Sequence, residues 1–390
     1  METQNEKVVE TTSAATENTG RRVGIKMIII FVLSLLLIIP MEMIEDLIYE
    51  RKRTSEDAIE KVTGQWCAAQ QIVGPTLTIP KQTYSTYTNV DGEESKVKSS
   101  VVDVKVLPKK LDIKGDIQNK IRKKGIYQIS LFSAPIEMNG FFELSEEMQK
   151  CVSEMDDVNR SVTVELALSD LKGITDEMKI TIAGTELDLK PDGNGLLNET
   201  SQISAKVNLG ELQDLNKIPF SMKFNIKGSQ SIKFVPIGEM TTVALTSNAT
   251  TPSFTGNFLP DESSVADSGF TCNWKISYLN RNYPQQISTE TRDVIDAVRN
   301  SAFGVDLLIP VQHYQQSLRC TKYAMLFIML TFAVFFFVEH IQQKNIHPIQ
   351  YLLVGLALTL FYSLLISLSE HLGLVPAYAV ASVMTIAMLT

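Results

Sequence analysis

Long apolar stretches stand at both ends of the chain, and a polar, often alternating pattern fills the middle. A helix needs about 20 residues to cross a hydrocarbon core of about 30 Å. Four stretches reach that length between polar residues that bracket them, namely residues 23–41, 320–338, 351–369 and 372–390. The pattern therefore predicts a membrane protein with an N-terminal transmembrane helix and a C-terminal bundle of transmembrane helices.

The first apolar stretch has the charged start of a secretory signal peptide, with Arg21, Arg22 and Lys26. It lacks the small residues of a cleavage site, because residues 39–43 read Ile-Pro-Met-Glu-Met. We therefore expect an uncleaved signal anchor and keep a cleaved signal peptide as the alternative. Residues 1–22 are polar and rich in Thr and Glu, which predicts a disordered cytoplasmic tail.

Basic residues favour a cytoplasmic N-terminus and an outer, periplasmic position for the middle of the chain. Residues 21–26 carry three cations, and Lys344 falls in the short loop between the second and third spans, on the same side. A second basic cluster at residues 51–53 carries less weight, because long domains cross largely regardless of charge. The fourth span runs to Thr390 without a polar flank, which leaves open whether it is truncated.

Residues 42–70 have helical spacing of apolar positions, so the first span should continue outward as a juxtamembrane helix that Gly74-Pro75 ends. Residues 71–318 should form a β-rich domain. Residues 161–168 alternate between apolar and polar, and hairpins are predicted around Ala183-Gly184 and around residues 227–230. Residues 190–197 and 260–269 are interpreted as loops. Such strand spacing favours a mainly antiparallel, sandwich-like fold.

Composition and charge narrow the function classes. The net charge is −8, which argues against a nucleic-acid partner. The four cysteines, Cys67, Cys151, Cys272 and Cys320, contain no CxxC pair, so a structural role or unpaired thiols are favoured over redox catalysis, and up to two disulfides stay open. Residues 192–195 resemble part of a calcium loop but lack its terminal Glu, so a turn is favoured. We expect no cofactor.

Nine short stretches, most of them in the C-terminal half, resemble the family of inner-membrane proteins called CreD. They are residues 73–75, 79–80, 253–260, 268–270, 303–306, 322–324, 330–332, 347–357 and 368–371, and Trp274 matches as well. The most specific is residues 347–357, which read HPIQYLLVGLA. Residues 82–220 match only in general character. The resemblance implies one N-terminal span, a large periplasmic domain and a C-terminal cluster of spans, with further spans beyond the position of Thr390.

The same resemblance implies a role in a bacterial two-component regulon, in cell-envelope integrity and in responses to β-lactams or colicins, without an accepted catalytic mechanism. We therefore expect a non-enzymatic protein of the bacterial inner membrane. Its expected partners are the lipid bilayer, a periplasmic ligand or envelope protein, and a second copy of itself. The alternatives are a transporter or flippase-like subunit and a membrane-anchored envelope hydrolase.

Polar residues at the membrane boundaries are the candidate functional residues, namely His347, Glu370 and His371. Glu370 could accept a proton or contact a ligand, although polar residues at the ends of helices commonly lie at the interface without such a role. Neighbours on a helix point about 100° apart, so residues 369–371 cannot form a catalytic relay. A metal site of Glu339, His340 and His347 is the weaker hypothesis, because their spacing alone is not a metal motif.

Overall fold

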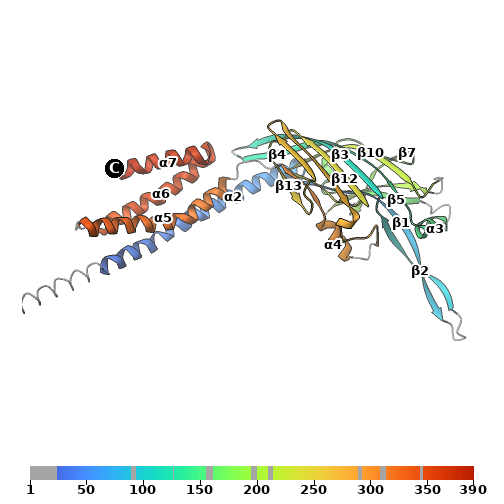
Figure 1. Cartoon of the computed structure of the whole chain (residues 1–390), viewed down its shortest axis with the longest axis horizontal. Helices are drawn as coiled ribbons and strands as arrows, with labels where there is room; N and C mark the ends of the chain where they lie inside the picture. The colour runs from blue at the N-terminus through green and yellow to red at the C-terminus, as the bar shows by residue number, and fades with distance from the viewer. Residues whose placement is uncertain are drawn as a thin grey trace, which may run out of the picture. The chain divides into compact units, whose positions relative to one another are not determined.

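The computed structural model describes residues 24–88, 94–125, 127–154, 161–194, 200–209, 214–288, 292–307, 313–342 and 346–390. Only the backbone is described for residues 85–88, 94–98, 161, 194, 288, 313–315 and 370. The chain divides into a helical unit, Met1–Ala58 with Val311–Thr390, and a β-rich domain, Ile59–Pro310 (Figure 1). The tail predicted at residues 1–22 lies outside the described residues.

The apolar stretches of the sequence are helices. Residues 24–36 are helical and continue, after Leu37, into α2 (Ile38–Trp66). After the β-rich domain come α5 (His313–Gln342), α6 (Pro348–Leu372) and α7 (Leu374–Leu389). In the described part of the chain, three helices are long and apolar enough to cross a membrane, namely Gly24–Trp66, Gln316–Gln342 and Pro348–Ser369. This confirms the predicted N-terminal apolar helix and C-terminal apolar helices.

The fourth predicted span differs in length from the prediction. It corresponds to α7, whose 16 residues measure about 24 Å. Gly373, at a φ of 85°, separates α7 from α6. Ala377 and Ala381 are buried against Leu365 of α6, because small side chains let two helices approach closely. The last two helices therefore form a hairpin, and α6 extends three residues beyond its predicted end at residue 369.

The β-rich domain confirms the large β-rich middle that the alternating pattern predicts. In chain order its strands are β1 (Gln70–Thr88), β2 (Glu94–Val106), β3 (Lys110–Lys124), β4 (Tyr127–Phe142), β5 (Ser161–Leu168), β6 (Lys179–Ile182), β7 (Thr185–Asp188), β8 (Lys190–Asn194), β9 (Ser201–Asn208), β10 (Ile218–Ser229), β11 (Ser231–Phe234), β12 (Met240–Ser247), β13 (Pro252–Gly256), β14 (Glu262–Ala266), β15 (Gly269–Ser277), β16 (Gln286–Ser288) and β17 (Phe303–Leu307). Its helices are α3 (Glu146–Ser153), α4 (Arg292–Asn300) and the single turns η1 (Leu171–Gly173) and η3 (Tyr278–Asn280). The domain ends earlier than the predicted residue 318, because α5 begins at His313.

Within the described ranges the strands form two sheets. The nine-stranded sheet has the order β13-β17-β11-β1-β5-β9-β8, with β2 paired to β1 and β16 paired to β2. The eight-stranded sheet has the order β14-β15-β12-β3-β4-β10-β6-β7. Two pairings are parallel, β1 with β11 and β3 with β12, and the others given are antiparallel. One apolar cluster contains buried side chains of both sheets, for example Leu77 of β1 and Ile113 of β3.

Glu165 of β5 shows where alternation alone misleads. The sequence pattern predicts that Thr163 and Glu165 lie on the face opposite the apolar residues, yet Glu165 is only 7% exposed. Its carboxylate pairs with the Nζ of Lys105 on β2, and that nitrogen is also 3.3 Å from the hydroxyl oxygen of Thr78 on β1. A buried charge needs such a partner, and alternation within one strand cannot reveal a partner on another.

The predicted hairpin around residues 227–230 is wrong, whereas the one around Ala183-Gly184 is confirmed. Ala183 and Gly184 both have positive φ, 48° and 91°, as a two-residue hairpin turn requires. At residues 227–230, by contrast, β10 and β11 belong to different sheets. Gln230, at a φ of 63°, lies where the chain crosses from one sheet to the other.

Three further predictions of local structure need correction. The juxtamembrane helix ends at Trp66, and Gly74 and Pro75 lie inside β1, where its pairing with β5 is irregular. The two predicted loops contain the edge strands β8 and β14, whose polar composition hid them. Asp192 and Gly193, predicted in a turn, belong to β8, and residue 195 lies outside the described residues.

Candidate functional site

A buried carboxylate joins three helices of the helical unit. Glu339, near the end of α5, is 8% exposed. Its Oε1 forms an ion pair with the Nζ of Lys26 and accepts a hydrogen bond from the Ile346 backbone N–H at 3.1 Å. Its Oε2 accepts a hydrogen bond from the Tyr351 hydroxyl at 3.0 Å. We call Lys26, Glu339, the Ile346 N–H and Tyr351 the Glu339 cluster.

The Glu339 cluster is unusual for its setting, because ionised side chains next to apolar helices are costly unless they are paired. Lys26 belongs to the N-terminal helix, Glu339 to α5 and Tyr351 to the first turn of α6. Lys26, which the sequence marks as part of the charged start of the first apolar stretch, is paired with Glu339 in the structure. The cluster therefore fastens the three helices to one another at a single carboxylate.

Apolar side chains pack beside the Glu339 cluster. The Tyr351 ring meets Phe332 edge to face, with centroids 5.7 Å apart and an interplanar angle of 81°. One turn further along α6, a Cβ on Gly355 would lie 3.0 Å from the Cζ of Phe332 and would also collide with Leu37. The absence of a side chain at Gly355 thus lets α6 approach both α5 and the N-terminal helix.

His347 has a local structural role. It caps the N-terminus of α6, where its ring accepts a hydrogen bond from the Ile349 N–H at 3.4 Å, and Pro348 occupies the first helical position. Both features favour helix initiation. His347 is exposed, and this candidate residue is therefore explained by the start of α6.

The weaker metal hypothesis finds no support in the geometry. His340 stacks on Phe336, with ring centroids 6.5 Å apart and planes 11° apart, while Glu339 is occupied by the cluster. His347 caps α6 as described above. Within the described ranges, no group of three or more His, Cys, Asp or Glu side chains is arranged to hold a metal ion.

The other two candidate residues lie at the opposite end of α6. Glu370 is part of the last helical turn, and its side chain lies outside the described part of the chain. His371 is exposed in the same turn, where a cation suits the helix dipole. The hydroxyl of Ser369 donates to the Ile366 carbonyl at 2.9 Å. His347 and His371 are therefore about 36 Å apart along the helix and cannot share a site.

The cysteines are all free thiols in this structure. Burial, with a smaller contribution from nearby Asp170, raises the pKa of Cys67 to about 12. Burial likewise raises the pKa of Cys272 to about 12. Because a nucleophilic or redox cysteine needs its thiolate, these two environments are typical of structural cysteines.

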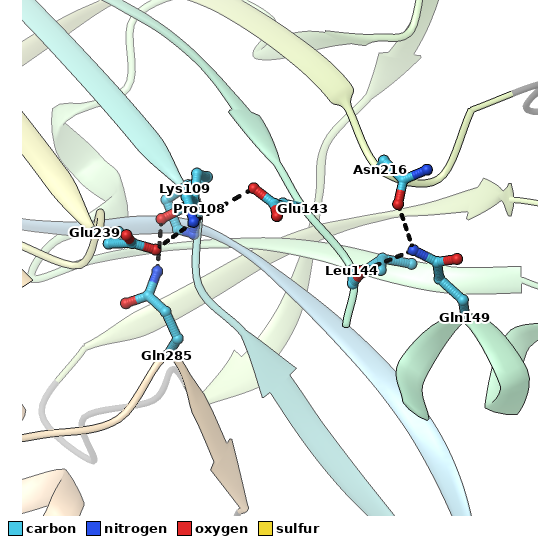
Figure 2. Close-up of polar contacts among 8 residues, drawn as sticks. All are labelled: Pro108, Lys109, Glu143, Leu144, Gln149, Asn216, Glu239 and Gln285. Atoms are coloured by element: carbon cyan, nitrogen blue, oxygen red, sulfur yellow. Dashed lines mark hydrogen bonds and ion pairs between the residues drawn. The ribbon is translucent and has the colours of Figure 1, made fainter. Parts of the chain in front are cut away.

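Figure 2 shows polar contacts where the chain passes from β2 to β3. Lys109 lies between two carboxylates, 2.9 Å from Glu239 and 3.4 Å from Glu143, and the hydrogen bond to Glu239 raises the pKa of Lys109. The Gln285 amide donates to the Pro108 carbonyl at 2.8 Å. Each of these side chains has a partner, which is typical of a structural junction between strands.

A second contact group shown in Figure 2 fixes α3. The Gln149 amide donates to the Leu144 carbonyl and to the Asn216 side-chain oxygen, at 2.8 Å in both cases. Elsewhere, a shallow surface hollow of about 410 Å³ lies over β12 and β15 and is lined by Asp261, Glu262 and Lys275, among others. It is open to solvent, so it defines no ligand by itself.

The sequence analysis missed the Glu339 cluster. The sequence indicated Lys26 only as part of the charged start of the first apolar stretch, and Glu339 as the end of the second stretch and a member of the weaker metal hypothesis. The charges and positions of Lys26 and Glu339 could have indicated the pair. The two residues have opposite charges and lie at ends of two spans that the predicted topology places on the same side of the membrane. Opposite charges that are both removed from water in the same region stabilise each other by forming an ion pair.

Comparison with known proteins agrees with this architecture. The family model described as "Inner membrane protein CreD" matches residues 22–390. The chain is also 31% identical over 360 residues to the inner membrane protein CreD of Escherichia coli strain K12, covering 92% of this chain and 78% of that protein. The matched range, residues 22–390, spans the apolar helices and the β-rich domain. The chain therefore belongs to the CreD family of inner membrane proteins.

Proposed function

We propose that this protein supports the integrity of the cell envelope and the response to envelope stress, such as exposure to β-lactams, without catalysing a reaction. The observation that carries the proposal is the family match over residues 22–390, which spans the helical unit and the β-rich domain alike. The architecture also supports the proposal, because a single helix, Gly24–Trp66, connects the N-terminal apolar segment to the β-rich domain.

In this proposal the chain crosses the inner membrane several times, and the β-rich domain, with its sheets packed as a sandwich, lies in the periplasm. Arg21 and Arg22 precede the first apolar helix and favour a cytoplasmic N-terminus. The domain would there meet a periplasmic ligand or envelope protein, and the helical unit would contact lipid and a second copy of the chain.

Four local environments support a non-enzymatic role. The thiols of Cys67 and Cys272 have raised pKa values, so they are poor nucleophiles. Glu339 uses both carboxylate oxygens for helix packing. His347 is engaged as a helix cap. These four groups thus already serve the fold.

The transporter and hydrolase alternatives rank behind this proposal. A transporter of polar solutes needs polar groups that face a path within the membrane. The hydroxyls of Thr331 and Thr359 instead donate to carbonyls of their own helices, of Phe327 and Leu356, at 2.8 Å. Accumulation of a solute in proteoliposomes would nevertheless favour the transporter.

The proposed role is tested by deleting the gene and complementing the strain with the native chain, with Glu339→Gln or with the matched surface variant Glu56→Gln. We expect deletion to increase sensitivity to detergents and β-lactams, with rescue by the native chain and by Glu56→Gln. Glu339→Gln should rescue poorly, because the helical unit is loosened. Unchanged sensitivity after deletion would contradict the proposed role.

Sidedness is tested separately. Ser264 is exposed on the edge strand β14, so Ser264→Cys provides a label site on the β-rich domain. A membrane-impermeant maleimide should label this cysteine in intact spheroplasts as strongly as in lysed ones. Labelling only after lysis would place the domain in the cytoplasm and overturn the proposed orientation.

A further inference from the structure

The strands β3 and β4 extend beyond both neighbouring strands as a two-stranded ribbon. The pairing of β3 with β12 ends at Ile117, and that of β4 with β10 reaches only to Leu131. Beyond these points β3 and β4 pair only with each other, out to Lys124 and Tyr127. Figure 1 shows the two strands side by side.

The end of this ribbon concentrates positive charge. The basic tip comprises Lys120, Arg122, Lys123 and Lys124, all of them exposed. None of the four forms an ion pair with a residue that the structure describes. In a chain with a net charge of −8, four unpaired cations within five residues call for a partner outside the chain.

The base of the ribbon is where the chain enters and leaves the domain. The Ser229 N–H donates to the Ala68 carbonyl at 3.2 Å, two residues after the end of α2. The next residue, Gln230, donates its N–H to the Ser130 carbonyl at 3.0 Å and accepts from the Leu307 N–H at 2.7 Å. Both connections to the apolar helices therefore start at the ribbon base.

The ribbon also runs in a defined direction along α2. The Trp66 ring lies under the Nζ of Lys227, 5.0 Å from the ring centroid, and Lys227 is paired with Ser133 of β4. Four residues nearer the tip, Ile129 packs against Val62, one turn earlier in α2. Moving from the ribbon base toward the tip thus follows α2 from Trp66 back to Val62.

The side chains around the cations suit a lipid surface. Ile121 is 53% exposed and Tyr127 is half-buried, which places an aliphatic and an aromatic group among the four charges. Cations attract anionic headgroups, while such side chains favour the boundary between headgroups and acyl chains.

We propose that the basic tip binds anionic phospholipid headgroups at the surface of the membrane from which α2 emerges. The β-rich domain would then be held by the tip as well as by its two covalent connections. Each cation near an anionic surface contributes about fivefold in affinity, so four together make a strong but salt-sensitive contact. This inference does not depend on the role in envelope integrity.

The test uses the full chain in nanodiscs of neutral phosphatidylcholine, or of phosphatidylcholine with about one third phosphatidylglycerol, and measures hydrogen–deuterium exchange of residues 119–130. In the anionic discs we expect exchange at the ribbon to slow by about an order of magnitude, and high salt should reverse the effect. The variant K120Q/R122Q/K123Q/K124Q should lose the difference between the discs.

A matched variant, K190Q/K206Q/K223Q/K275Q, removes four exposed charges from the outer parts of both sheets and should keep the difference. Hydrogen–deuterium exchange of β10 and β12 reports whether each variant is folded. If the tip variant is not folded, single Lys→Gln changes at the tip should each reduce the difference in ribbon exchange between anionic and neutral discs. Equal ribbon exchange of the native chain in both discs would overturn the proposal. The proposal would also be overturned if the folded tip variant still exchanged more slowly at the ribbon in anionic discs than in neutral ones. That result is expected if α2 alone orders the ribbon.

Discussion

At the scale of single residues, the sequence located the charged side chains but not their partners. Lys26 was recognised in the charged start of the first apolar stretch, Glu339 at the end of the second, and Glu165 at a polar position of a strand. Each in fact belongs to an ion pair, which is partly buried for Lys26–Glu339 and buried for Lys105–Glu165. The partners are 313 and 60 residues away in sequence, so no local pattern could connect them.

The Glu339 cluster can be tested by a double-mutant cycle. Glu339→Gln should lower the free energy of unfolding in detergent by about 1–3 kcal/mol, less than for a fully buried pair because the Lys26 side chain keeps 23% exposure. Lys26→Met combined with Glu339→Gln should cost less than the sum of the single changes, because no charge is then left unpaired. Thermal unfolding followed by circular dichroism measures this.

The control for that cycle is Lys52→Met. Lys52 and Glu56 form an exposed pair at 3.7 Å one helical turn apart, so its loss should change stability by less than about 0.5 kcal/mol. Additive effects of Lys26→Met and Glu339→Gln would mean that the two side chains do not interact in the folded protein.

The raised thiol pKa values predict both reactivity and pH dependence. An ordinary thiol has a pKa of 9.0, whereas that of Cys67 is about 12, so the folded protein holds this proton more tightly than the unfolded chain does. The corresponding stability is complete below pH 9 and declines as the pH rises from 9 toward 12. At pH 8, iodoacetamide should alkylate Cys67 and Cys272 on the order of a thousandfold more slowly than the partly exposed Cys151.

Mass spectrometry of tryptic peptides would measure the three alkylation rates. In denaturant the rates should become equal, because the burial that raises the pKa is lost. Rapid alkylation of Cys67 in the folded protein would show that its surroundings are open to solvent.

At the scale of elements, the strongly patterned segments were predicted well. The apolar helices, the strand at residues 161–168 and the hairpin at Ala183-Gly184 follow from composition and turn chemistry. The short polar edge strands β8 and β14 were missed, because they lack the apolar alternation that identifies a half-buried strand. Gly74-Pro75 was read as a helix stop, although in this fold it forms an irregularity inside β1.

Helix packing at Gly355 gives a prediction at this scale. Gly355→Leu should destabilise the helical unit by about 1–3 kcal/mol, because the new side chain must push α6 away from Phe332 and Leu37. The matched control is Gly24→Leu, where an added Cβ meets nothing within 4 Å. Unfolding in detergent should separate the two variants, and equal stability would mean that α6 does not pack closely there.

At the scale of the whole molecule, the order of the parts was predictable and the order of the strands was not. Apolar ends and a β-rich middle can be read directly from the distribution of hydrophobic residues. Sheet membership depends on pairings between distant segments, such as β1 with β11 and β3 with β12. For that reason β10 and β11, consecutive in the chain, were wrongly joined as one hairpin although they lie in separate sheets.

The hydrogen bonds that link Ala68 to Ser229, and Gln230 to Leu307, imply that the domain is a cassette with neighbouring ends. Segments whose two ends lie close together can be excised or transplanted with little disturbance of the host. Removing the cassette and bridging the gap with a short glycine–serine linker should therefore leave the apolar helices able to assemble, while the excised piece should be secretable as a soluble protein.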